Sequence, residues 1–135
     1  GQQKEDLYPI TRAIPGSRYD FIIVSLSSLR LEEALETLRD NRFKGTILLF
    51  CGVWESREHI EHIMAGRPYL LGYPVAGGRL NKADCRLECV VFDHIMLESR
   101  KRTSVENYDD ITRSFLQSGI KASAPTTCWS GFGCI

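Results

Sequence analysis

The stretch that decides the fold runs from residue 20 to residue 52 and reads DFIIVSLSS at 20–28, LEEALETLRD at 31–40 and GTILLFCG at 45–52. The first and last of these segments are apolar on both faces, which is typical of parallel strands buried between helix layers. In the middle segment Leu31, Ala34, Leu35 and Leu38 recur at helical spacing. The stretch therefore predicts a parallel βαβ unit, whose ligands bind at the carboxyl ends of its strands.

The composition limits the function classes. With 135 residues the chain predicts one domain, and its 17 basic and 17 acidic residues leave no net charge to attract nucleic acid. No apolar run approaches the roughly 20 residues that span a bilayer, so we expect no membrane partner. The five cysteines are an odd number without a CxxC pair, which fits a reducing compartment. We expect a cytoplasmic protein.

The rest of the chain adds elements to the same sheet. A helix is predicted over 57–65, then a short strand from Tyr69 that enters a glycine-rich loop at 72–78. Alternating apolar and polar residues at 85–92 and 94–98 predict an antiparallel hairpin at one edge of the sheet. A last helix over 104–118 and a short strand over 120–124 are predicted to follow. The prediction is an α/β fold, a partial Rossmann-like doubly wound sheet, mostly parallel, in a single incomplete domain over 1–135.

Small residues at the strand ends are the candidate ligand contacts. They allow a ligand to approach the backbone, and neighbouring helix amino termini favour anionic groups. The alternative is that the serines only cap a helix and the glycines only form turns. The cofactor-binding candidates are Ser25, Leu26, Ser27 and Ser28 at the first strand end and Cys51, Gly52 and Val53 at the second, with Gly72, Ala76 and Gly77 on the substrate side.

Three other groups are weighed against structural roles. His59 and His62 share a helix face, but their HxEH order matches no zinc motif, so a solvated face is favoured. Cys85 and Cys89 are expected about 13 Å apart on a strand, too far for one zinc ion, and are interpreted as core cysteines. Cys51 lies at a strand end, where a thiol can have a lowered pKa, but the sequence places no base beside it.

Five segments resemble, in order and spacing, the nucleotide-binding domain of the ketopantoate reductase (2-dehydropantoate 2-reductase) family over about Tyr19–Trp129. They are YDFIIVSL at 19–26, EAL at 33–35, TILLFCG at 46–52, LGYPVAGG at 71–78 and SGI at 118–120, before a Trp. The resemblance implies an NADP-dependent oxidoreductase that reduces a small 2-keto acid to the 2-hydroxy acid, with a helical second domain. It also implies that the cofactor lies on the strand ends.

The chain differs from the family at the positions where the family carries its catalytic residues. The family's lysine after the first strand falls on Ser27, its Asn-Gly near Gly52-Val53, and its second lysine near Gly131. No GxGxxG occurs anywhere in the sequence. We therefore expect a domain that lacks the GxGxxG unit and the helical domain and that is not competent as a reductase in this form. It is either a fragment or a divergent relative with a different function.

A different class stays open, namely a flavodoxin-like regulatory or protein-interaction module. The receiver type needs an acidic residue at a strand end, whereas Asp20 lies at the opposite end of its strand. An interaction module predicts an exposed apolar patch, and the fragment hypothesis predicts one as well. An exposed sheet edge would also favour self-association into a homo-oligomer.

Overall fold

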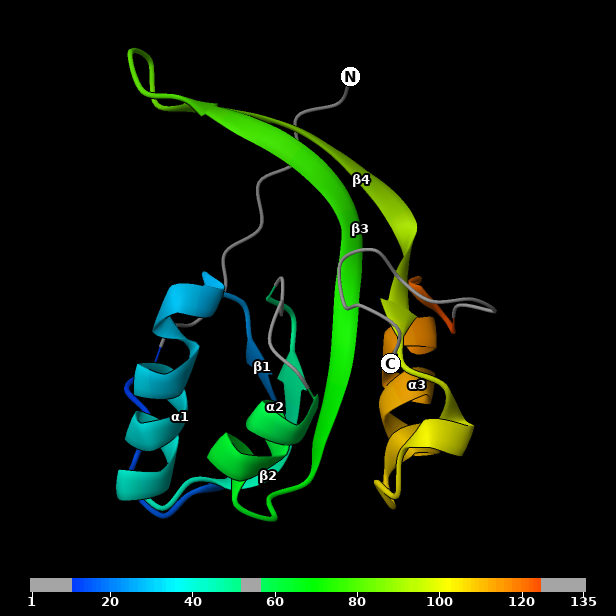
Figure 1. Cartoon of the computed structure of the whole chain (residues 1–135). Coiled ribbons are helices and arrows are strands. Elements are labelled where there is room, and N and C mark those ends of the chain that lie inside the picture. Colours follow the sequence, from blue (N-terminus) through cyan, green and yellow to red (C-terminus); the bar gives the residue numbers. More distant parts are fainter. Residues whose placement is uncertain (1–10, 52–56, 125–135) are drawn as a thin grey trace.

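A computed structural model describes residues 11–51 and 57–124, in which five strands, three α-helices and two short 3-10 helices follow one another (Figure 1). The elements are β1 (Arg18–Val24), η1 (Ser28–Arg30), α1 (Leu31–Asp40), β2 (Lys44–Leu49), α2 (Arg57–Met64), β3 (Tyr69–Asn81), β4 (Arg86–Leu97), η2 (Arg100–Arg102), α3 (Tyr108–Gln117) and β5 (Lys121–Ser123).

The strands form one sheet in the order β1-β2-β3-β4-β5. β1, β2 and β3 are parallel to one another, β4 is antiparallel to β3, and β5 is parallel to β4. The predicted fold class, a mostly parallel Rossmann-like sheet with one antiparallel pair, is therefore confirmed.

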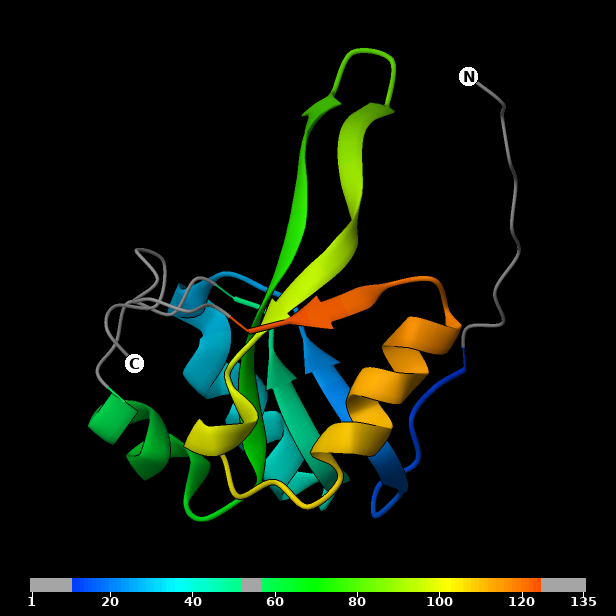
Figure 2. The same cartoon turned by 90° about the vertical axis from the view of Figure 1, so that its right-hand side faces the viewer.

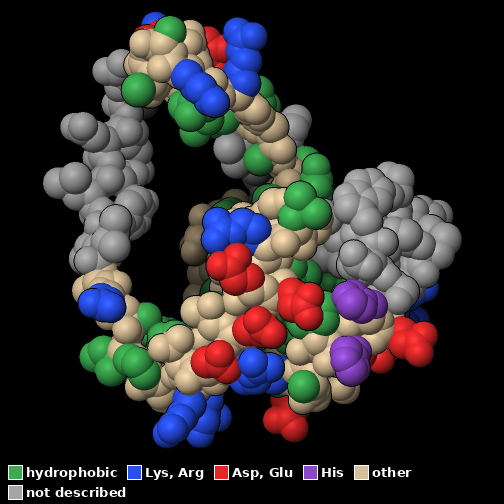
Figure 3. All heavy atoms as spheres, turned by 60° about the vertical axis from the view of Figure 1, so that its left-hand side comes forward, with side chains coloured by type: hydrophobic (Ala, Val, Ile, Leu, Met, Phe, Trp, Pro, Cys, Tyr) green, Lys and Arg blue, Asp and Glu red, His purple; other side chains and the backbone are tan. Residues whose placement is uncertain are grey.

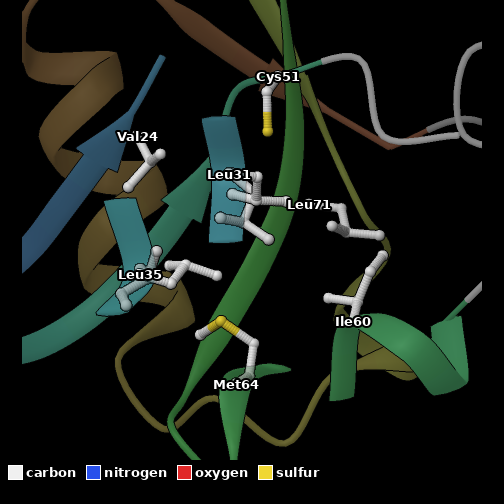
Figure 4. Close-up of a cluster of buried hydrophobic side chains, with 9 residues drawn as sticks. Val24, Leu31, Leu35, Cys51, Ile60, Met64 and Leu71 are labelled. Atoms are coloured by element: carbon white, nitrogen blue, oxygen red, sulfur yellow. The ribbon is translucent and has the colours of Figure 1, made fainter. Parts of the chain in front are cut away.

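Helices cover both faces of the sheet. Buried side chains of α1 and α2 pack on one face against Ile47, Leu49 and Leu71, as Figure 4 shows for part of this cluster. On the opposite face Leu48 and Leu70 pack against α3. Successive residues of β2 thus point into two cores, which is why the strand is apolar throughout. The sequence predicted a sheet covered by helices on both faces, and this alternation of buried side chains is the reason.

The glycine-rich segment is not a loop, and this part of the prediction was wrong. β3 continues through it to Asn81, and residues 86–97 form the single strand β4 rather than a hairpin of their own. Gly72 and Gly78 have no positive φ; each is closely packed instead, and a Cβ on Gly78 would lie 2.7 Å from the backbone oxygen of Glu88. The glycines allow close packing of an extended strand.

The turn between β3 and β4, residues 82–85, was not predicted from the sequence because it contains no glycine. Asn81 Oδ1 accepts a hydrogen bond of 3.1 Å from the Ala83 amide, and Cys85 takes the left-handed conformation with φ of 53°. The outer parts of the two strands, 76–81 and 86–91, extend beyond the body of the sheet as a two-stranded arm (Figure 2).

Glu98 connects four elements. Its side chain is 3% exposed; Oε1 accepts a hydrogen bond from the Leu71 amide at 3.1 Å, and Oε2 lies 3.0 Å from Arg57 Nη1. Its backbone oxygen accepts a hydrogen bond from the Tyr108 hydroxyl at 2.8 Å. The residue that follows β4 thereby holds β3, α2 and α3 together.

We expect Glu98→Ala to lower the free energy of unfolding by about 2–4 kcal/mol, because it leaves a buried amide and a guanidinium without their acceptor. Urea denaturation measures the change. The matched control is Glu88→Ala, which breaks the exposed 2.9 Å pair with Arg79 and should change stability by less than about 0.5 kcal/mol. Equal losses for the two variants would contradict the role assigned to Glu98.

Candidate functional site

The carboxyl ends of β1 and β2 lie side by side, beside the first residues of β3. Val24 is level with Leu49, and Leu49 is level with Leu71. The Phe50 amide donates a 2.9 Å hydrogen bond to the Val24 oxygen, which continues this alignment beyond the strands. Ser25 and Cys51 therefore follow the ends of two adjacent strands, which is the position where ligands bind in sheets of this type, and Gly72 lies beside them within β3.

The four residues after β1 are arranged as a helix cap. Ser27 Oγ accepts a 3.4 Å hydrogen bond from the Leu29 amide and caps η1, so the capping alternative is confirmed for this serine. Ser25 and Ser27 are exposed, Ser28 is half-buried, and Leu26 packs against the first core cluster. The serine side chains thus face the solvent within reach of a ligand, while Leu26 anchors the segment.

Charges near the start of α1 weaken its attraction for anions. Glu32 and Glu33 occupy its first turn, and Glu33 forms a 3.2 Å ion pair with Arg30. Carboxylates at this position offset the partial positive charge of a helix amino terminus. Figure 3 shows acidic and basic side chains interspersed on the face of the molecule that carries α1. This end of the sheet therefore has small side chains and little excess positive charge, so it is not a strong anion-binding site.

Cys51 is 3% exposed, and burial raises the pKa of its thiol despite an opposing backbone hydrogen bond. The lowered pKa that the sequence suggested is wrong, because desolvation disfavours the thiolate. Gly52 and Val53, the other two candidates at this strand end, lie outside the described residues.

The predicted substrate side is divided by the length of β3. Gly72 is buried against Phe50 and Leu97, directly beside the strand ends. Ala76 and Gly77 are exposed and belong to the arm, four and five residues farther along the strand and so roughly 13 Å or more away. Gly72 alone of the three lies beside the candidate cofactor residues.

The cysteines and histidines form no metal centre in the part of the chain that is described. Residues 11–51 and 57–124 contain no group of three histidine, cysteine or acidic side chains that would hold an ion. Cys85 and Cys89 are both exposed, so their interpretation as core cysteines was wrong. Both lie at or near the tip of the arm, which has no core of its own.

Two hollows were not found from the sequence. A groove of about 490 Å³ follows the outer edge of β1 and is lined by Ile22, Leu26, Ala34 and Leu38, among others. A larger cleft of about 1380 Å³ lies at the opposite, amino ends of the parallel strands. The sequence signal that could have indicated this cleft is that β1 and β2 each begin with a basic residue, Arg18 and Lys44.

No protein-family model matches the sequence, and no curated protein matches it. Solved structures do resemble the fold. A 2-dehydropantoate 2-reductase from Geobacter metallireducens aligns with a TM-score of 0.60 at 12% identity, over 84% of this chain and 38% of the reductase. Prephenate dehydrogenase from Aquifex aeolicus aligns with a TM-score of 0.54 at 18% identity, over 78% of this chain and 39% of that protein.

A third match is D-mandelate dehydrogenase in complex with NADH, with a TM-score of 0.56 and 14% identity, over 81% of this chain and 36% of the dehydrogenase. The chain thus spans less than two fifths of the length of these proteins. The likeness shows the fold that they share, the Rossmann-like arrangement of dehydrogenases and reductases. No helix in the described part of the chain is long and apolar enough to cross a membrane.

We expect Cys51 to react with iodoacetamide at least about tenfold more slowly at pH 7 than Cys85 and Cys89, because a buried thiol with a raised pKa forms little thiolate. Its rate should increase with pH into the alkaline range. Mass spectrometry of digested samples gives the rate for each cysteine, and the urea-unfolded chain serves as the control. Equal rates in the folded chain would contradict the assigned burial.

Proposed function

We propose that this chain is the dinucleotide-binding part of an NADP-dependent oxidoreductase of the ketopantoate reductase type, acting on a small 2-keto acid. The observation that carries the proposal is the alignment of the carboxyl ends of the parallel strands β1 and β2, with small residues following them. The fold shared with 2-dehydropantoate 2-reductases and with an NADH-bound dehydrogenase supports it.

In this proposal the dinucleotide lies across the ends of β1 and β2, and the keto acid lies toward β3. The cofactor supplies a hydride to the carbonyl carbon, and the carbonyl oxygen takes up a proton. The residues proposed to contact the dinucleotide are Ser25, Leu26, Ser27, Ser28, Cys51, Gly52 and Val53. Gly72 is proposed to lie on the substrate side, whereas Ala76 and Gly77 lie too far along β3 to share this site.

The chain alone should not be a competent catalyst. Ser27 carries a hydroxyl where the resembling enzymes carry a lysine, and that hydroxyl already caps η1. A neutral hydroxyl stabilises the developing negative charge on the substrate oxygen less than an ammonium group does. The function proposed for this chain is therefore binding, and catalysis requires groups from another segment or another protein.

Titration with NADPH tests the binding. We expect the amide signals of residues 25–28 and 50–51 to shift at millimolar cofactor, because these residues line the strand ends. Ser25→Trp should weaken the binding about tenfold by filling the approach to the backbone. Ser118→Trp, at an exposed serine after α3, is the matched control and should have no effect. Without shifts at the strand ends, the cofactor proposal fails.

The alternative, a non-enzymatic interaction module, is favoured by one observation, the apolar outer edge of β1. Among the described residues no strand pairs with β1 on this side, and Ile23 is 47% exposed beside the groove there. Unpaired apolar edges recruit other chains. We propose that two copies associate through β1.

Ile23→Lys should shift the monomer–dimer equilibrium toward the monomer, because a charged side chain on an edge strand opposes pairing. Sedimentation velocity over a concentration series measures the shift. Ile14→Lys, at a residue that is 72% exposed before β1, is the control and should leave association unchanged. A chain that remains monomeric at high concentration would rule out this interface.

A further inference from the structure

The cleft at the amino ends of the parallel strands is strongly basic, although the whole chain has no net charge. It has a volume of about 1380 Å³ and is lined by residues from β1, β2, α2 and the segment between η2 and α3. Six of its lining side chains are basic and three are acidic. The basic ones are Arg18, Lys44, Arg57, Arg67, Lys101 and Arg102.

Two of these cations are held directly opposite each other. Arg18 at the start of β1 is the register partner of Lys44 at the start of β2. Like charges in this position destabilise a sheet. Neither side chain takes part in any of the ion pairs formed among the described residues. Within that part of the chain, no carboxylate therefore forms an ion pair with either cation.

A β-bulge lies beside this pair. β1 carries one residue more than β2 between Arg18 and Phe21, and Gly45, with a φ of 145°, lies opposite the extra residue. A Cβ at position 45 would approach the Tyr19 oxygen to 2.6 Å, so glycine is required there. Bulges redirect side chains and are frequent beside binding sites.

Arg67 brings a third cation to the same place. Its Nη2 donates a 2.7 Å hydrogen bond to the oxygen of Phe43, the residue before Lys44. Its Nη1 is buried and has no hydrogen-bond partner among the described residues, and burial lowers the pKa of the guanidinium. A buried donor without a partner is costly, and an anionic acceptor would remove that cost.

The acidic side chains of the cleft do not neutralise this group. Glu61 lies 3.4 Å from Arg57, which also forms the 3.0 Å pair with Glu98, so this group has one negative charge in excess. Asp20 and Glu106 add two more, against the five other cations of the cleft, namely the three already described, Lys101 and Arg102. An excess of positive charge therefore faces the cleft.

We propose that this cleft binds the phosphate group of a small anionic ligand, with Arg18, Lys44 and Arg67 as its direct partners. A phosphate offers several strong acceptors to the forked donors of arginine and places two negative charges among three cations. The site is distinct from the proposed dinucleotide site, because the six residues of β2 separate the two ends of the sheet by roughly 20 Å.

Titration of the whole chain with inorganic phosphate, at constant ionic strength maintained with chloride, tests the site. We expect saturable amide shifts at residues 18–20, 44–46 and 66–67. Arg67→Gln and Lys44→Gln should each weaken the binding about tenfold, since each removes a charge-assisted contact. Lys44 is exposed, so its variant tests the site even if Arg67→Gln fails to fold.

The matched control is Arg113→Gln on α3, whose exposed guanidinium pairs with Asp110 at 3.2 Å and lies outside the cleft. This variant should bind phosphate as the unaltered chain does. A parallel titration with glycerol phosphate distinguishes a phosphate ester from free phosphate as the ligand. If glycerol phosphate binds more tightly than inorganic phosphate, the ligand is a phosphate ester; if it binds more weakly, the ligand is the free ion. Shifts spread over all basic surfaces, or equal loss in Arg113→Gln, would overturn the proposal.

Discussion

The contacts of one buried carboxylate tie α2 to the sheet at the junction of β3 and β4, where the same residue also binds α3. The parallel half ends with β3, and the antiparallel half begins with β4, so the polar groups at their junction must be satisfied without water. Glu98 does this by accepting from the Leu71 amide and from Arg57, while the Tyr108 hydroxyl binds its backbone oxygen. A charge with 3% exposure is tolerated there because every acceptor is used. Both helix layers are therefore tied to the same point of the sheet.

The sequence predicted the parts of the fold that depend on local pattern. The helix over 31–40 was confirmed, because amphipathic spacing is a strong signal. The short last strand was confirmed as well, although its residues are largely exposed. The glycine-rich segment was assigned wrongly because glycine is as typical of turns as of closely packed strands. Only the tertiary contact of Gly72 with Phe50 and Leu97 distinguishes these two cases. This contact cannot be predicted from the composition of the segment.

The positions of Ser25 and Cys51 in the fold were predicted from the sequence, but the burial of Cys51 was not. Ser25 and Cys51 do follow adjacent strand ends, since the topology of a βαβ unit leaves no other arrangement. The burial of Cys51 depends on α1 and α2 packing above it, which a linear pattern does not specify. The arm was missed for a similar reason: its turn, Asn81 to Arg86, uses side-chain hydrogen bonds in place of glycine.

The two ends of the parallel strands differ in chemistry, and this difference limits what each end can do. At the carboxyl ends, carboxylates in the first turn of α1 offset the helix charge, so an anionic ligand gains little there beyond shape and backbone contacts. At the amino ends, Arg18, Lys44 and Arg67 line one cleft, and none of them forms an ion pair among the described residues. An anion bound in this cleft would interact favourably with these cations and would give Arg67 Nη1 a hydrogen-bond acceptor. Ligand binding at the amino ends would therefore be coupled to stability, whereas binding at the carboxyl ends would depend mainly on fit.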